Sequence, residues 1–337
     1  MNVAFFGSRT YEPPFFDRAN ADGRHQITYL EPRLAPETAT LAAGHEGVCV
    51  FVNDELSAEV VERISGHGVK AIALRCAGFN NVDIDAAEKH EITVVRAPAY
   101  SPASTAEHAV TLMMGLNRKL HRAYNRVRDG NFSLAGLMGF NMEGKTAGII
   151  GTGKIGQGVA RILHGFGCRL LGYDPYPNDF CRELGLAYVD IDELYAASHI
   201  ITLHCPLSPD SYHMIAAAAI ARMRQGVMLI NTSRGGLVDT QAVIDGLKSG
   251  RVGSLGIDVY QEEADLFFED LSTEVIQDDV FARLLTFPNV IVTGHQAFFT
   301  QESMEAIAET TIDNLSQLER GEACPNQVTR QRHYRRA

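Results

Sequence analysis

Three glycines in one short stretch constrain the fold of this chain more than any other feature. Gly151, Gly153 and Gly156 have the spacing G-x-G-x-x-G, directly after the apolar run "TAGII" and directly before residues with amphipathic helical spacing. In such a unit Gly151 permits a tight turn, Gly153 lets the backbone approach a pyrophosphate, and Gly156 lets the helix pack on the sheet. The helix N-terminus offers free N–H groups to phosphate oxygens. The stretch therefore predicts a dinucleotide-binding turn, against the simpler interpretation of a strand-to-helix turn without a ligand.

An acidic residue in the next strand supports the dinucleotide interpretation. Asp174 ends the apolar run "RLLGYD". A carboxylate there can accept hydrogen bonds from the adenosine ribose hydroxyls, and it would repel a 2′-phosphate. The pattern predicts NAD rather than NADP as the cofactor.

Short apolar runs alternate with helix-length segments over nearly the whole chain, which is typical of parallel sheets covered by helices on both faces. We therefore predict an α/β fold with two doubly wound, Rossmann-like parallel sheets. The predicted strands are 2–7, 26–30, 47–52, 70–75 and 92–95, followed by 146–151, 169–174, 199–205, 226–232, 254–260 and 289–294.

Two long helices indicate where the domains meet. At 337 residues the chain is long for one core,. One helix starts with Ser101 as N-cap and Pro102 at its first position. The last, at about 301–318, has an apolar face, and we expect it to return to the first sheet. The predicted substrate-binding domain, flavodoxin-like, is 1–100 and 298–337, and the NAD-binding Rossmann domain, 101–297, is inserted into it.

The composition limits the classes of binding partner that this protein can have. The formal net charge of −11 disfavours nucleic acid and anionic membranes, so basic clusters near 118–128 and 330–336 are interpreted as a solvated helix end and a terminal tail,. Six scattered cysteines without a C-x-x-C pair suggest neither a disulfide framework nor a zinc site,. No apolar stretch approaches the length of a membrane span, and the opening run "NVAFFG" does not have the pattern of a secretory signal,. We expect a cytoplasmic protein that binds a small molecule and no metal.

Three later strands end in side chains that carry chemistry. "GVMLINTSRGG" ends in Arg234, "SLGIDVYQEE" in Glu262 and Glu263, and "NVIVTGHQ" in His295. Ligands of open parallel sheets bind beyond the carboxyl ends of the strands. An arginine can hold a carboxylate and polarise a ketone, and a histidine next to a carboxylate can deliver a proton to the developing alkoxide. We predict Arg234, a glutamate and His295 as catalytic residues for reduction of a 2-oxo acid.

The motifs "GTGKIG", "DPYP", "HCPL", "NTSRGG", "GIDVYQEEADLFFED", "IQDDVF" and "GHQAFF" resemble those of the D-isomer-specific 2-hydroxyacid dehydrogenases. The resemblance extends from the first strand to about Asn326 and is strongest to the bacterial fermentative D-lactate dehydrogenase branch. It implies reversible, NAD-dependent reduction of pyruvate to D-lactate. In this family the relay glutamate stands five residues after the strand-end aspartate, which selects Glu263, counted from Asp258.

The resemblance also implies further site residues. It implies NAD contacts at Lys154, Ile155, Asp174, Cys205, Pro206, Ser211, Thr232, Ser233 and Asp258. We expect further NAD contacts at Gly151, Gly153 and Gly156 of the glycine-rich turn and at Arg234. Substrate contacts are implied at the backbone amides of Ala77 and Gly78, together with Arg234, and at a pocket wall of Tyr100 and Phe298 or Phe299. The family relation further implies a homodimer or homotetramer.

Other interpretations stay open. Gln261 and the pair Ser104 and Thr105 depart from the family pattern, and the pair puts the preference for the substrate side chain in doubt. One alternative is therefore a dehydrogenase for a bulkier 2-oxo acid. Another is a non-enzymatic, NAD-sensing relative, because the fold family includes corepressors. A metal enzyme is disfavoured, because the 12 histidines include no H-x-x-x-H pair,.

Overall fold

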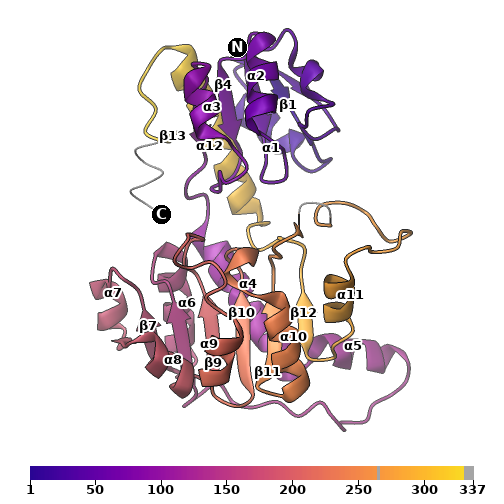
Figure 1. Cartoon of the computed structure of the whole chain (residues 1–337), viewed down its shortest axis with the longest axis vertical. Coiled ribbons are helices and arrows are strands. Elements are labelled where there is room, and N and C mark those ends of the chain that lie inside the picture. Colours follow the sequence, from indigo (N-terminus) through magenta and orange to yellow (C-terminus); the bar gives the residue numbers. More distant parts are fainter. Residues whose placement is uncertain (264–265, 330–337) are drawn as a thin grey trace. The chain divides into compact units, whose positions relative to one another are not determined.

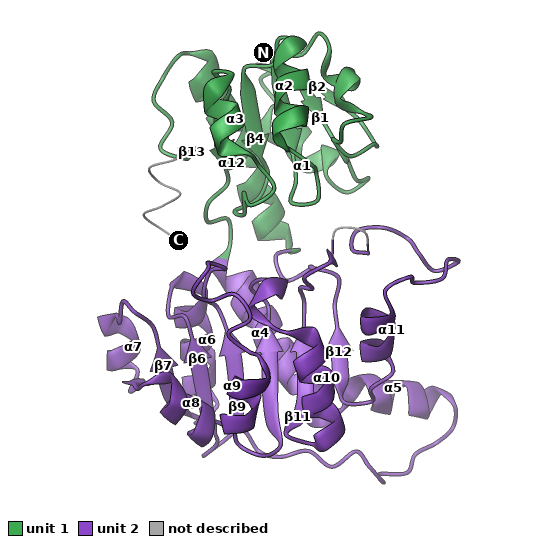
Figure 2. Cartoon of the chain, viewed as in Figure 1, with its two compact units in different colours: residues 1–101, 299–337 green, residues 102–298 purple. Residues whose placement is uncertain are grey.

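The structure is a computed structural model that describes residues 1–263 and 266–329 and divides the chain into two compact units (Figures 1 and 2). Unit 1 consists of Met1–Ser101 and Phe299–Ala337, and unit 2 consists of Pro102–Phe298. The chain enters unit 2 between Ser101 and Pro102 and leaves it between Phe298 and Phe299. The basic tail at 330–336 lies outside the described residues.

Unit 1 contains a six-stranded sheet of order β13-β5-β4-β3-β1-β2. Its five predicted strands pair in parallel, whereas β13 was not predicted and pairs antiparallel with β5. The elements are β1 (Asn2–Phe5), α1 (Pro13–Ala19), β2 (Gln26–Tyr29), η1 (Ala39–Ala42), β3 (Gly47–Val50), α2 (Ala58–Gly66), β4 (Ala71–Leu74), α3 (Ile84–Lys89), β5 (Thr93–Arg96), α12 (Gln301–Glu319) and β13 (Gln327–Val328).

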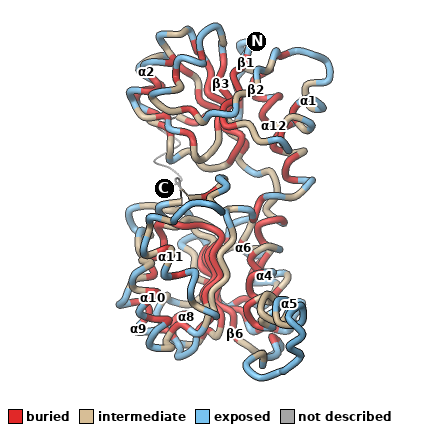
Figure 3. Tube along the Cα trace, turned by 90° about the vertical axis from the view of Figure 1, so that its right-hand side faces the viewer, coloured by how far each residue is buried: buried red, intermediate tan, exposed pale blue. Residues whose placement is uncertain are grey.

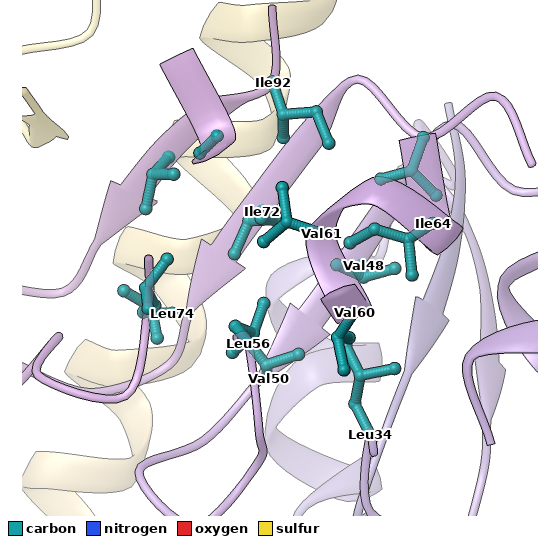
Figure 4. Close-up of a cluster of buried hydrophobic side chains, with 14 of the residues drawn as sticks. Leu34, Val48, Val50, Leu56, Val60, Val61, Ile64, Ile72, Leu74 and Ile92 are labelled. Carbon is teal, nitrogen blue, oxygen red and sulfur yellow. The ribbon is translucent and has the colours of Figure 1, made fainter. Parts of the chain in front are cut away.

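Helices cover both faces of this sheet. Figure 4 shows one core, in which α2 side chains such as Val61 and Ile64 pack on Val48, Val50 and Ile72 of the sheet. On the other side α12 packs against α1, β4 and β5 and buries one apolar face. Burying each such aliphatic side chain contributes about 1.5–3 kcal/mol. The last helix of the chain therefore completes the core of the first unit.

Unit 2 contains a seven-stranded sheet of order β12-β11-β10-β9-β6-β7-β8, all of it parallel. The two-residue β8 was not predicted. The elements are α4 (Pro102–Arg118), α5 (Leu120–Arg128), β6 (Thr146–Ile150), α6 (Lys154–Gly165), β7 (Arg169–Tyr173), α7 (Asp179–Glu183), β8 (Ala187–Tyr188), α8 (Ile191–Ala197), β9 (Ile200–Leu203), α9 (Ala217–Arg222), β10 (Val227–Asn231), η2 (Gly235–Leu237), α10 (Thr240–Ser249), β11 (Val252–Ile257), α11 (Asp279–Leu285) and β12 (Val290–Val292).

Alternate strand residues of unit 2 enter two different cores. Ile149 and Ile200 belong to the core under α4 and α6, while their neighbours Ile150 and Ile201 belong to the core under α8, α9 and α10. Side chains of a strand alternate between the faces of its sheet, so a strand buried on both faces must be apolar throughout. This explains the continuous apolar runs in the sequence, and it confirms the predicted α/β fold class.

A kink separates α4 from α5. Lys119 has a φ of +50°, a left-handed conformation that ends α4 and redirects the chain into α5. Figure 3 shows α5 and the chain that follows it as largely exposed. The basic residues predicted to lie on a solvated helix end are located here.

Candidate active site

The glycine-rich turn between β6 and α6 has the shape that a pyrophosphate requires. Gly151 has a φ of +90°, and a Cβ there would lie 2.5 Å from the backbone nitrogen of Cys205. A Cβ on Gly156 would lie 2.1 Å from the carbonyl oxygen of Gly151. At Gly153 no described atom lies within 4 Å of the Cβ position, and no side chain caps α6. Two glycines permit close packing, and the third leaves the helix N-terminus accessible to an anion.

Asp174 lies beside this turn. Its Oδ2 accepts hydrogen bonds from the backbone nitrogen of Thr152 at 2.6 Å and from the Thr152 hydroxyl at 3.0 Å. Its Oδ1 accepts from the backbone nitrogen of Tyr176 at 2.8 Å. The carboxylate is thus fixed next to the glycine turn, where it suits a ribose with two free hydroxyls.

Replacing Asp174 with asparagine should shift cofactor preference toward NADPH. Asparagine keeps an acceptor for Thr152 but removes the charge that opposes a 2′-phosphate. Two like charges about 4 Å apart near a protein surface repel by about 4 kcal/mol, so we expect the NADH to NADPH ratio of kcat/KM to fall at least about 10-fold. The measurement is that ratio, with Asp245→Asn on the exposed face of α10 as control. An unchanged ratio would remove Asp174 from the cofactor site.

Residues predicted to contact NAD also line the ends of β9 and β10. The hydroxyl of Ser233 donates to the carbonyl of Cys205 at 2.7 Å and so joins the two strand ends. The hydroxyl of Ser211 donates to the carbonyl of Pro206 at 2.8 Å and closes the next turn. The Oγ1 of Thr232 is buried without a hydrogen-bond partner among the described residues. A buried hydroxyl of this kind is suited to a ligand, because an unpaired polar group is costly.

His295 is presented by a strained turn after β12. Its φ is +53°, in the left-handed region that residues with a Cβ rarely adopt,. The backbone nitrogen of His295 donates to the carbonyl of Asp258 at 2.8 Å, which ties the turn to the end of β11. Such a strained backbone conformation is maintained only by surrounding contacts, and these conformations are common at functional sites.

The imidazole of His295 is paired with Glu263. Its Nδ1 lies 2.8 Å from Glu263 Oε1, with both side chains about four-fifths buried. The other oxygen of Glu263 accepts from the backbone nitrogen of Tyr260 at 2.9 Å, and the Phe268 ring lies beside the imidazole at 5.8 Å between centroids. Glu262 is exposed. Since Nδ1 is occupied by Glu263, Nε2 is the nitrogen left to exchange a proton with a substrate.

Arg234 lies between β10 and η2 in an extended conformation. Its carbonyl accepts from the Asn231 side chain at 2.9 Å, and its guanidinium Nη1 donates to the carbonyl of Ser233 at 2.7 Å. The side chain is half-buried. A guanidinium has five N–H donors, so donors remain for a ligand. The backbone of Arg234 is thus fixed at the same edge of the sheet as Glu263 and His295.

Asp258, one of the implied NAD contacts, follows directly after β11. Its side chain is fully buried. One carboxylate oxygen accepts from the hydroxyl of Thr293 at 2.5 Å and the backbone nitrogen of Gln296 at 2.9 Å, and the other accepts from that of Ala297 at 2.8 Å. The carboxylate therefore holds the turn that carries His295.

Within unit 1, the loop after β4 carries Ala77 and Gly78, both half-buried. Arg96 at the end of β5 donates to the carbonyl of Ala77 at 2.6 Å and lies 4.9 Å from the Phe79 ring centroid. In a trans peptide the carbonyl and the following N–H point in opposite directions. The N–H of Gly78 therefore points away from Arg96.

The aromatic residues predicted for a pocket wall have unlike environments. Phe298 is 8% exposed and Phe299 is 48% exposed. In unit 1 the Phe299 ring packs edge-on against Tyr11, with centroids 4.6 Å apart. Tyr100 is half-buried. Phe299 thus offers the larger surface to a ligand, and Tyr11 is a neighbour that the sequence did not indicate.

The described residues contain no group of three or more His, Cys, Asp or Glu side chains placed to hold a metal ion. The buried histidine His204 bonds through Nε2 to the hydroxyl of Thr202 at 2.9 Å, and burial lowers its pKa to about 3. Nor does any helix in the described part of the chain have the length and apolar character of a membrane span.

Comparisons with known proteins identify the family of this chain. Residues 110–297 match the family model "D-isomer specific 2-hydroxyacid dehydrogenase, NAD binding domain". The chain is 54% identical to D-lactate dehydrogenase of Escherichia coli, over 97% of this chain and 100% of the relative. The apo-structure of that enzyme superposes with a TM-score of 0.90 at 51% identity, covering 98% of this chain and 100% of the other.

A more distant structure contains ligands. D-lactate dehydrogenase from Aquifex aeolicus, complexed with NAD and lactic acid, is 33% identical with a TM-score of 0.85, covering 95% of this chain and 96% of the other. The predicted family and the predicted cofactor, NAD, are confirmed. This chain belongs to the D-isomer specific 2-hydroxyacid dehydrogenase family, and residues 110–297 are its NAD-binding domain.

Proposed function

We propose that this protein interconverts pyruvate and D-lactate with NAD as the redox partner. The observation that carries the proposal is the His295–Glu263 pair, held 2.8 Å apart at the sheet edge that also bears the glycine-rich turn. The names of similar proteins, D-lactate dehydrogenases from Escherichia coli and Aquifex aeolicus, support pyruvate as the substrate.

The residues suit a balanced reduction of a ketone. NADH supplies the hydride that becomes bonded to C2 of pyruvate. Protonated His295 gives the proton from Nε2 to the ketone oxygen, which yields the D-hydroxy acid and a neutral imidazole. Glu263 stabilises the imidazolium and fixes its orientation, and the Tyr260 N–H fixes Glu263,. In the oxidation of D-lactate the same imidazole acts as the base.

Arg234 and the loop of unit 1 are the proposed substrate-binding groups. The forked guanidinium suits the carboxylate and the ketone oxygen of a 2-oxo acid, and a lysine cannot match that geometry. We assign the amides of Ala77 and Gly78 to the substrate carboxylate, and Arg96 fixes the direction of the second of these. On this assignment unit 1 is the substrate-binding domain, with Phe299 and Tyr100 beside the methyl group.

Assembly as a homodimer or homotetramer is part of the proposal. The segment from α5 to about residue 140 exposes Leu120, Tyr124, Phe132, Leu134 and Met138 at 60% or more. Large apolar side chains exposed together in one segment are typical of an interaction site. The free state of all six cysteines supports a reducing compartment, and we place the protein in the cytoplasm,.

The test is a steady-state assay of NADH oxidation with pyruvate, 2-oxobutyrate and phenylpyruvate, followed by chiral analysis of the product. We expect pyruvate to have the highest kcat/KM and the product to be D-lactate. A higher kcat/KM for a larger acid would favour the dehydrogenase for a bulkier substrate. NADH binding without turnover of any acid would favour the NAD-sensing alternative.

A further inference from the structure

One histidine outside the predicted site contacts the turn that carries His295. His108 lies in the second turn of α4, with its side chain 15% exposed. Its Nε2 lies 3.0 Å from the Thr293 hydroxyl oxygen and 3.4 Å from Asp258 Oδ1. All three residues belong to unit 2. The turn that carries His295 is therefore hydrogen-bonded to α4 as well as to its own sheet.

The hydrogen-bond chemistry assigns the donor in this contact. The Thr293 hydroxyl has one proton, and it is directed to Asp258 Oδ1 at 2.5 Å. An ionised carboxylate can only accept hydrogen bonds. The Thr293 oxygen is then free to accept, so the group facing it at 3.0 Å, His108 Nε2, must donate. His108 thus polarises the hydroxyl that holds Asp258, and Asp258 holds the backbone of Gln296 and Ala297, directly after the bend at His295.

The contact also joins the two places where the chain crosses between units. Pro102 begins both unit 2 and α4, and His108 follows within two turns. Thr293 and Ala297 lie shortly before the return crossing, which falls between Phe298 and Phe299. Both connecting segments are therefore anchored to one buried carboxylate within unit 2, next to the strained backbone of His295.

We propose that His108 is a positioning residue for His295. It keeps the turn at 293–297 in its strained conformation and so keeps the His295 imidazole within hydrogen-bond distance of Glu263. This proposal rests on the proposed function only in that His295 is the proton donor. The hydrogen bonds that hold the turn lie within unit 2 and do not depend on that function.

The test compares two substitutions in the full-length enzyme. His108→Gln keeps a side-chain N–H donor, while His108→Leu removes it at similar volume. A displacement of about 1 Å in a reacting group can cost up to about 10²-fold in rate, so we expect His108→Leu to lower kcat about 10-fold with the KM for NADH unchanged. His108→Gln should recover kcat to within about 3-fold. Thr111→Ala, one turn further along α4 on its exposed face, is the control and should behave as wild type.

A second measurement does not depend on turnover. Hydrogen exchange of the Gln296 and Ala297 amides, whose acceptor is Asp258, should be about 10-fold faster in His108→Leu and near wild type in His108→Gln,. Unchanged exchange in His108→Leu, or equal losses of kcat in both variants, would overturn the proposal. If the wild-type protein turns over no 2-oxo acid but the exchange rates change as expected, the proposed function is wrong. The role of His108 in holding the turn at 293–297 is then still supported.

Discussion

Replacing His295 with asparagine should lower kcat for pyruvate reduction at least about 10²-fold, with the affinity for NADH unchanged. The variant loses the group that delivers the proton, while its backbone remains suited to the site, because asparagine accepts a left-handed φ better than other residues with a Cβ. The measurements are steady-state kinetics and a fluorescence titration of NADH.

Two comparisons make this result specific. His164→Gln, at the exposed end of α6, should keep wild-type kinetics and controls for the loss of any one histidine. Single-turnover measurements would assign the loss to the chemical step rather than to product release. A near-normal kcat in His295→Asn would mean that another group supplies the proton, and the mechanism proposed for the Glu263 pair would fail with it.

Arg234→Lys should lower kcat/KM for pyruvate at least about 10²-fold, through both a higher KM and a lower kcat. Lysine keeps the charge but loses the fork that contacts a carboxylate and a ketone oxygen together. Each hydrogen bond lost to a charged group costs about 1.5–3 kcal/mol, so loss of the bidentate contact is the origin of the expected factor. The affinity for NADH should change little, because the glycine-rich turn and Asp174 are unaltered.

Arg222→Lys provides the matched control for this change. Arg222 is an exposed arginine in α9 that pairs with Asp192, so its replacement should leave pyruvate kinetics unchanged. Arg234→Lys with wild-type KM and kcat would show that charge alone suffices at this position. The substrate would then be held mainly by groups other than a bidentate arginine.

The sequence predicts the architecture well where strands are buried on both faces. Runs such as "TAGII" and "GVMLIN" are almost entirely apolar because both faces of their sheet are covered, and this signal is local. The two-residue strands β8 and β13 carry no such pattern, since they form by pairing with a neighbour already in place. The break at Lys119 is also invisible, because lysine carries no preference for positive φ.

The candidate site likewise contains some residues that the sequence predicts and others that it does not. Arg234, Glu263 and His295 follow predicted strands, and the rule that ligands bind at the carboxyl edge gathers them from sequence. His108 and Arg96 act through contacts that depend on packing: His108 and Thr293 are 185 residues apart. Neither has a motif that marks it. The sequence likewise does not indicate in which direction the buried carboxylate of Asp258 points.

The order in which the units can be completed follows from the position of α12. Unit 2 is one continuous segment, whereas the sheet of unit 1 needs α12 to cover β4 and β5 and β13 to pair with β5. During synthesis the first hundred residues therefore leave the ribosome with one apolar sheet face open, and it stays open until nearly the whole chain has emerged. Unit 2 can fold before unit 1 is complete. Nascent chains stalled before Gln301 should therefore be the species most prone to aggregate and to engage chaperones.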